Sequence, residues 1–188
     1  MNALADAKVA DYLQSHFVAT YLKVGTFQIV GDRKVGGNVA CYFCLPDGTV
    51  LHAVPGPANG PTFLKEARWA WEIRKSTLTH ATDLVTGQID KGRWQSEVKK
   101  AHEERFVAAT NPQLARKLRV GAMAGAQNGN NAHANVPLPA DLPRHVNQQT
   151  QVHWLLATRP LERIGQIYPI VWQEILREQL SNLPVAMR

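Results

Sequence analysis

Cysteine and long apolar runs are both scarce in this chain of 188 residues. Two cysteines exclude a disulfide-dense scaffold. No apolar run approaches the ~18 residues that a membrane-spanning helix needs. Charged residues make up only 19% of the chain and hydrophobic residues 45%, so the sequence is neither disordered nor a charged tract. These limits predict a soluble globular domain with a core of its own.

The first residues of the sequence show none of the features of a secretory leader. The first residues, MNALADAKVADYLQSHF, lack a charged start, an apolar stretch and a small-residue cleavage site. They carry apolar side chains at helical spacing instead, which predicts a helix. We therefore expect a cytoplasmic protein, and a signal peptide upstream of Met1 would make it an exported one.

Runs of β-branched and aromatic residues predict strands in the first third of the chain. We expect strands over residues 18–24, 39–45 and 50–54. An Asp-Gly pair lies between the second and third runs, and this dipeptide tolerates the positive φ that hairpin turns require. These two strands are therefore predicted to form a hairpin, in which a two-residue loop would place Phe43 opposite His52.

Helical spacing dominates the rest of the chain, apart from one polar stretch. We expect helices over residues 62–75, where Gly60-Pro61 supplies the opening, and over residues 90–109. Residues 121–149 are dense in Gly, Asn, Ala, Gln and Pro, which predicts a loop or linker. From residue 150 to residue 188 the apolar residues return to helical spacing.

Two segments resemble part of the thioredoxin-like fold. The segment GGNVACYFCLPDGTVLHAVPGPANGPTFLKEARWAWE resembles its last hairpin and helix, and ADYLQSHFVATYLKV resembles its middle helix and strand. The resemblance covers about residues 3–74. It depends on the order of the predicted elements and on the residues of the hairpin. It implies an α/β fold: a thioredoxin-like sheet-and-helix core with an added C-terminal helical extension.

The same resemblance implies a domain organisation and a function. A partial core would span residues 1–75, a helical extension 76–120, a polar loop 121–149, and a C-terminal helical segment packing on the core 150–188. In the family a redox Cys-x-x-Cys opens a helix after the first strand, and here both would lie before Met1. The family's cis-proline position corresponds to Val39 or Ala40, and neither is proline. A non-catalytic binding or scaffold module is the function this pattern favours.

The two cysteines stand in a Cys-x-x-Cys spacing, Cys41-Tyr42-Phe43-Cys44. On a helix such a pair is close, but three positions along a strand separate its members by about 10 Å and turn them to opposite faces. A disulfide needs Cα atoms within about 7 Å. We therefore interpret both as small apolar residues of a half-buried strand. Thiol–disulfide exchange through Cys41 or Cys44 remains the enzymatic alternative.

The histidines and tryptophans give the remaining candidate binding residues. Cys41 and His52 would share one face of the hairpin, but two ligands do not make a zinc site. The seven histidines match no metal motif, so no metal or other cofactor is predicted. Trp69 and Trp71 lie two apart on one predicted helix and point in different directions. His52, Trp69 and Trp71 are the binding candidates, although the density of aromatic residues favours core packing for the tryptophans.

Positive charge is concentrated in the middle of the chain. The net charge is +6, and residues 59–119 hold twelve basic and seven acidic side chains. A basic region allows nucleic-acid association through helices within residues 62–119, but no stacking aromatics or known module accompany it, which favours a solvated basic face. The expected partner is another protein or an acidic ligand.

Overall fold

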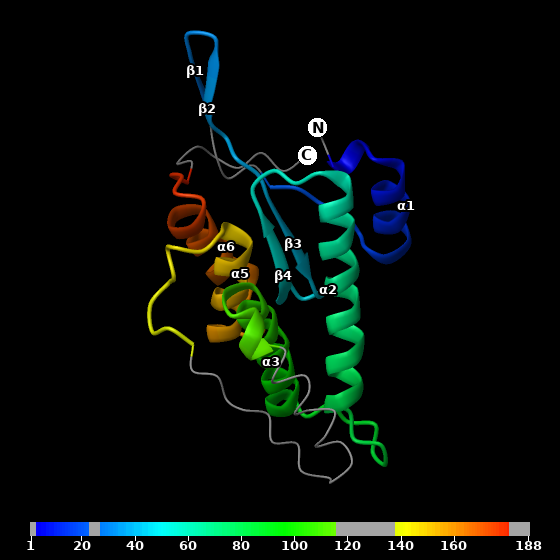
Figure 1. Ribbon diagram of the computed structural model, residues 1–188. Helices are drawn as coiled ribbons and strands as arrows, with labels where there is room; N and C mark the ends of the chain where they lie inside the picture. Colours follow the sequence, from blue (N-terminus) through cyan, green and yellow to red (C-terminus); the bar gives the residue numbers. More distant parts are fainter. Residues whose placement is uncertain (1–2, 23–26, 116–137, 181–188) are drawn as a thin grey trace.

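The computed structural model describes residues 3–22, 27–115 and 138–180. Within them the chain is a mixture of helices and strands, as predicted, and helices lie on both sides of a small antiparallel sheet (Figure 1). None of the described helices is long and apolar enough to cross a bilayer. The elements are η1 (Ala3–Ala5), α1 (Ala7–His16), β1 (Phe27–Val30), β2 (Arg33–Gly36), β3 (Ala40–Cys44), β4 (Val50–Pro55), α2 (Gly60–Ala81), α3 (Lys91–Thr110), α5 (Gln148–Thr158), α6 (Ile164–Ile170) and the π-helical turn η2 (Val171–Ile175).

The predicted hairpin is confirmed as β3 and β4. The two strands pair antiparallel, and Phe43 lies opposite His52, as expected. The turn is one residue longer than a two-residue loop, because Leu45 and Thr49 close it and a register shift follows between Phe43 and Cys44. Gly48 occupies the left-handed region at φ 82°, where the absence of a Cβ removes the steric cost.

The prediction of a strand over residues 18–24 is wrong for residues 18–22, which the structure describes. Residues 18–22 form no strand, because none of the described strands pairs with them. Val18 is 98% exposed. Residues 23 and 24 lie outside the described residues. The strands of this region are instead β1 and β2, which form a separate ribbon projecting from the body (Figure 1). Gly31, at φ 61°, opens their two-residue turn.

The hairpin β3–β4 separates two hydrophobic cores, because alternate residues of a strand point to opposite faces. On one face, Phe43 and Val54 pack with residues of α1 and α2. On the other face, Val50 and Ala53 pack with residues of α3, α5, α6 and η2. The sheet therefore lies between two helical layers, and residues far apart in the sequence meet across it (Figure 1).

Both predicted middle helices are present. The first, α2, begins after the N-cap Asn59, whose side chain accepts a hydrogen bond from the Thr62 amide, and it continues to Ala81. The boundary expected at residue 75 therefore falls inside this helix. The second, α3, begins after the N-cap Asp90.

The C-terminal segment is largely helical up to Ile175, as expected, and it supplies much of one core, while residues 181–188 lie outside the described part. Helix α5 is buried along most of its length and contacts both α3 and β4. The side chains of Leu155 and Leu156 are 2% and 1% exposed. Of the polar stretch expected over 121–149, residues 138–147 contain no helix or strand, and residues 121–137 lie outside the described part.

Candidate metal centre

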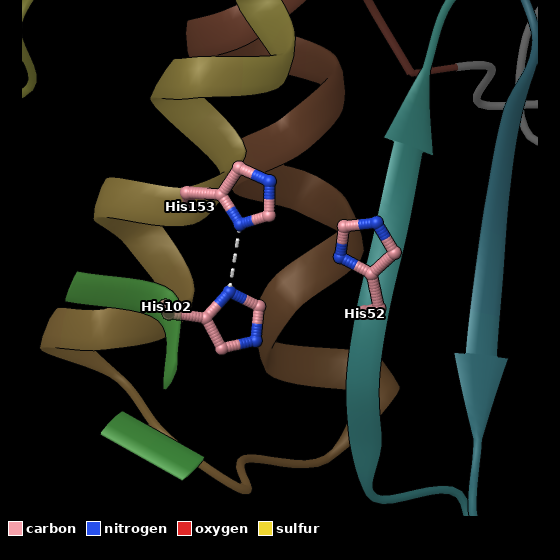
Figure 2. A group of neighbouring side chains, drawn as sticks. All are labelled: His52, His102 and His153. Atoms are coloured by element: carbon pink, nitrogen blue, oxygen red, sulfur yellow. Dashed lines mark hydrogen bonds between the residues drawn. The ribbon is translucent and has the colours of Figure 1, made fainter. Parts of the chain in front are cut away.

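Three buried histidines meet where β4, α3 and α5 come together. His52 lies on β4, His102 on α3 and His153 on α5 (Figure 2). His52 and His102 are 0% exposed and His153 is 3% exposed. Each offers one ring nitrogen, and these three atoms lie within 4.8 Å of one another. Figure 2 shows the rings turned toward a common point between the strand and the two helices.

The local sequence explains why each ring faces inward. The pairing of β4 with β3 sets His52 opposite Phe43, and their rings stack with centroids 6.1 Å apart. On α3, His102 lies four residues after the buried Val98 and four before the buried Phe106, so it belongs to the inward stripe of that helix. Helix α5 is buried on most sides and carries His153 with it.

Hydrogen bonds assign a tautomer to the first two rings. His52 Nε2 lies 3.0 Å from Glu66 Oε2, and His102 Nε2 lies 3.0 Å from the Leu51 carbonyl oxygen. Both partners are acceptors, so each Nε2 carries the proton and donates it. In a neutral imidazole this leaves Nδ1 of His52 and of His102 as a bare lone pair, which is the form that binds a metal.

The ring of His153 joins this hydrogen-bond network through His102. His153 Nδ1 lies 3.0 Å from His102 Nδ1, and since the latter is bare, His153 is the donor (Figure 2). His52 Nδ1 faces these two rings and has no hydrogen-bond partner. Among the described residues only one other buried side-chain polar atom lacks a partner, the Tyr42 hydroxyl. The cluster therefore contains a buried, unused acceptor.

Burial keeps the three imidazoles neutral. It lowers the pKa of His102 to about 3 and that of His153 well below the ordinary value. Burial also lowers the pKa of His52, although the hydrogen bond to the Glu66 carboxylate works in the other direction. Removing an ionised ring from water costs more than that one hydrogen bond returns. At neutral pH all three rings are therefore uncharged, and those of His52 and His102 present a bare Nδ1.

A carboxylate, a guanidinium and an indole form the wall of the cluster. Arg105 Nη1 lies 2.7 Å from Glu66 Oε2, the oxygen that also accepts from His52. Burial raises the pKa of Glu66, but the hydrogen bond from His52 and the charge of Arg105 outweigh it and hold that pKa below its ordinary value. The Arg105 guanidinium lies 4.3 Å from the centre of the Trp69 ring. Trp69 itself lies against the three histidine rings, with centroids 4.6, 4.9 and 5.2 Å away.

Two of the predicted binding residues meet in this cluster and the third does not. His52 and Trp69 are in edge-on contact. Trp71 points away, toward α1, where its ring lies 5.0 Å from that of His16 and 6.2 Å from that of Phe17. The expectation that the two tryptophans point in different directions is met, and Trp71 packs between helices.

The cysteines lie apart from the histidines, on opposite faces of β3. Cys41 packs in the core formed with α1 and α2, and Cys44 packs in the other core. Both are free thiols. Burial raises the pKa of each to about 11, so little thiolate is present at neutral pH.

No spacing in the sequence marks His102 and His153 as ligands. The three histidines are separated by 50 and 51 residues, and no short motif covers ligands drawn from three elements. A weaker signal existed on α3, where residues 98, 102 and 106 form one stripe and a histidine interrupts an apolar face.

The arrangement suits coordination of a transition metal. Neutral imidazole nitrogens are ligands for zinc, copper, iron and nickel. Tetrahedral zinc holds nitrogens at about 2.0–2.1 Å, which places two ligand atoms about 3.3 Å apart. Small rotations of the rings from their present separations, 3.0 Å between His102 and His153 and at most 4.8 Å across the cluster, would reach that geometry.

Comparisons of the chain with protein-family models, with curated proteins and with solved structures give no match. A function for this protein is therefore inferred from the chemistry of its own residues, and the histidine cluster is the feature with the most specific chemistry.

Proposed function

We propose that this chain is a metal-binding protein that holds one transition-metal ion between His52, His102 and His153. Zinc is the best fit because it accepts three imidazoles in tetrahedral geometry and needs no redox partner. The observation that carries the proposal is the Nδ1 atom of His52, which is buried, without a hydrogen bond, and turned toward the other two rings. A bound ion would use that lone pair.

The second layer of contacts supports the same proposal. Metal-binding histidines commonly donate their other ring N–H to a carboxylate or a backbone carbonyl, which fixes the tautomer and raises the basicity of the ligand. Glu66 plays this part for His52, and the Leu51 carbonyl plays it for His102. Two of the three rings are thus already held in the orientation and tautomer that a metal requires.

A purely structural role explains the cluster less well. Leaving a buried polar atom without a partner costs about 1–3 kcal/mol, whereas an apolar side chain of similar shape at position 52 would avoid that cost. Three neutral rings buried together also lose their hydration. A metal ion offsets both costs.

Isothermal titration of chelator-treated protein with zinc tests the proposal. We expect one ion per chain, and we expect His52→Ala, His102→Ala and His153→Ala each to abolish tight binding. His80→Ala is the matched control, because the His80 side chain on α2 is 62% exposed and lies outside the cluster. Unchanged zinc binding in all three cluster variants would contradict the proposal.

Thermal unfolding gives an independent readout. A ligand that binds only the folded state stabilises it by RT ln(1 + [L]/Kd), so zinc should raise the Tm of the parent chain. The cluster variants should fold but lose that zinc-dependent rise. A variant that fails to fold would show no cooperative transition with or without zinc, which separates loss of the site from loss of the fold.

We also propose that the segment from β3 to α2 belongs to a thioredoxin-like module without catalytic function. The hairpin and the helix that the resemblance implies are both present, in the implied order. The raised thiol pKa values of Cys41 and Cys44 support a non-catalytic role. An insulin-reduction assay tests this: we expect no activity. Activity that Cys41→Ala or Cys44→Ala abolishes would favour the thiol–disulfide oxidoreductase instead.

A further inference from the structure

We infer that the metal ion in this site carries a small, exchangeable anion as its fourth ligand. This inference rests on the proposed metal site and adds the class of molecule that the site would take: monoanions of two or three atoms, such as hydroxide, cyanide or azide. The ligand count and the charge of the site lead to it.

The ligand count leaves one position open. Among the residues that the structure describes, the group of side chains able to hold an ion together has three members, all histidines. Glu66, the nearest carboxylate, already accepts from His52 and from Arg105 through one oxygen. Four-coordinate zinc with three protein nitrogens takes its fourth ligand from solution.

The charge balance makes that ligand an anion. The three imidazoles are neutral, and the carboxylate of Glu66 and the guanidinium of Arg105 cancel each other in a direct ion pair. A divalent ion would therefore bring two uncompensated positive charges into a buried site, which is costly. A bound monoanion halves that excess charge, whereas neutral water leaves it unchanged.

Within the neutral ion pair with Glu66, Arg105 is the positive end and attracts an anion. Its guanidinium lies 4.3 Å from the centre of the Trp69 ring, and Trp69 contacts all three histidine rings, so the positive charge stands close to the cluster. The same charge opposes the metal ion itself. Arg105 and Glu66 should therefore act in opposite directions on the two binding steps: Glu66 favours the cation, and Arg105 favours the anion bound to it.

The enclosure of the cluster limits the size of the anion. Two of the rings are 0% exposed, the third is 3% exposed, and Trp69 covers them from the side of α2. The smallest monoanions are therefore the ones that we expect to reach the ion. Carboxylates or phosphate esters would require the wall of the cluster to open.

Cobalt substitution separates the two binding steps. Cobalt(II) shares the tetrahedral preference of zinc in such sites and gives visible absorption bands that respond to a change of ligand. Chelator-treated protein in a chloride-free buffer is first saturated with cobalt and then titrated with azide. We expect one cobalt per chain and then a saturable change in the bands with one azide per cobalt.

Three variants give the sharpest contrast. Glu66→Gln should weaken cobalt binding by about 10–100-fold, as loss of an outer-shell partner does, and should tighten azide binding to the loaded protein. Arg105→Gln should leave cobalt binding as tight or tighter and should weaken azide binding several-fold. Lys99→Gln removes the same charge from the exposed side of α3 and should change neither. Arg105→Lys keeps the charge and should retain azide binding if Arg105→Gln fails to fold.

The outcomes distinguish the two proposals. Cobalt bands that do not respond to azide would overturn the anion site and leave the metal site standing. If Arg105→Gln and Lys99→Gln weaken azide binding equally, the effect comes from the general surface charge, and the role of Arg105 is overturned. If cobalt does not bind at all, the metal site and the anion site both fail.

Discussion

The Nδ1 atoms of His102 on α3 and His153 on α5 face each other at 3.0 Å, although the two residues are 51 positions apart in the sequence. Two bare nitrogens would repel at this distance, so one proton lies between them, and the Leu51 carbonyl requires it to belong to His153. The side chain that donates in the metal-free protein is therefore the one whose proton must move before all three Nδ1 atoms can bind an ion. Metal binding and the proton on His153 are coupled in this site.

A double-mutant cycle measures this contact in metal-free protein. We expect His153→Leu to lower the free energy of unfolding by about 1–3 kcal/mol, because it leaves His102 Nδ1 buried without a donor. Adding His102→Leu to that variant should cost less than His102→Leu costs alone, with a coupling of about 0.5–3 kcal/mol. Urea unfolding at neutral pH gives all four values. Additive effects would mean that the two rings do not interact.

Acid should destabilise the metal-free protein from near-neutral pH downward. The pKa values of His52, His102 and His153 in the fold lie below the ordinary value of 6.5, so the unfolded chain takes up protons first as the pH falls. Stability is therefore full above pH 6.5 and decreases below it, by about 1.4 kcal/mol per pH unit for each such histidine.

Urea unfolding between pH 7 and about pH 5 checks this slope, because most carboxylates titrate below that window. His153→Leu should reduce the change of unfolding free energy with pH by the contribution of one histidine, about 1.4 kcal/mol per pH unit. A free energy of unfolding that stays constant over the window would contradict the neutral, buried state of the cluster.

Removing the carboxylate of Glu66 should be among the most damaging single changes. Glu66→Ala leaves the Arg105 guanidinium without its ion pair and the His52 N–H without its acceptor. Breaking one side of a buried ion pair costs about 3–5 kcal/mol. Glu72→Ala, at an exposed position of the same helix, should change stability by no more than about 0.5 kcal/mol. Equal losses of unfolding free energy in the two variants would show that the contacts of Glu66 do not contribute to stability.

The cysteines should resist alkylation in the folded chain. With a pKa of about 11 in place of 9.0, each thiol holds about a hundredfold less thiolate at neutral pH, and burial restricts access further. Iodoacetamide should react slowly at pH 8, faster with each step toward pH 10, and rapidly in urea. Mass spectrometry of the labelled chain gives the rates. Rapid labelling of folded protein at pH 8 would point to an activated thiol.

Local chemistry made parts of this fold predictable. The Asp-Gly turn, the Pro61 helix opening and the capping Asp90 act within a few residues of themselves, and the elements they begin or connect are present. Residues 18–22 have strand-like composition, but a strand also needs a partner, and sequence composition does not supply one. The β1–β2 ribbon carried a usable signal in its Gly31-Asp32 pair.

The histidine cluster could be predicted only in part, for a related reason. Pairing within one hairpin fixed the position of His52, and the prediction that it lies opposite Phe43 is confirmed. His102 and His153 reach it through the packing of α3 and α5 on β4, which depends on contacts between segments about 50 residues apart. Helical periodicity says which face of a helix is inward, but it does not say which strand that face meets.

The position of α5 has a consequence for the folding of the chain during its synthesis. Synthesis runs from the N-terminus, so β4 and α3 emerge well before residues 148–158, which cover them in the finished fold. Until then, one face of the hairpin and two of the three histidines lack their packing partner. The nascent chain would expose that apolar face during the interval, which is the condition under which chaperones bind. The histidine cluster would therefore be completed only late in the synthesis of each chain.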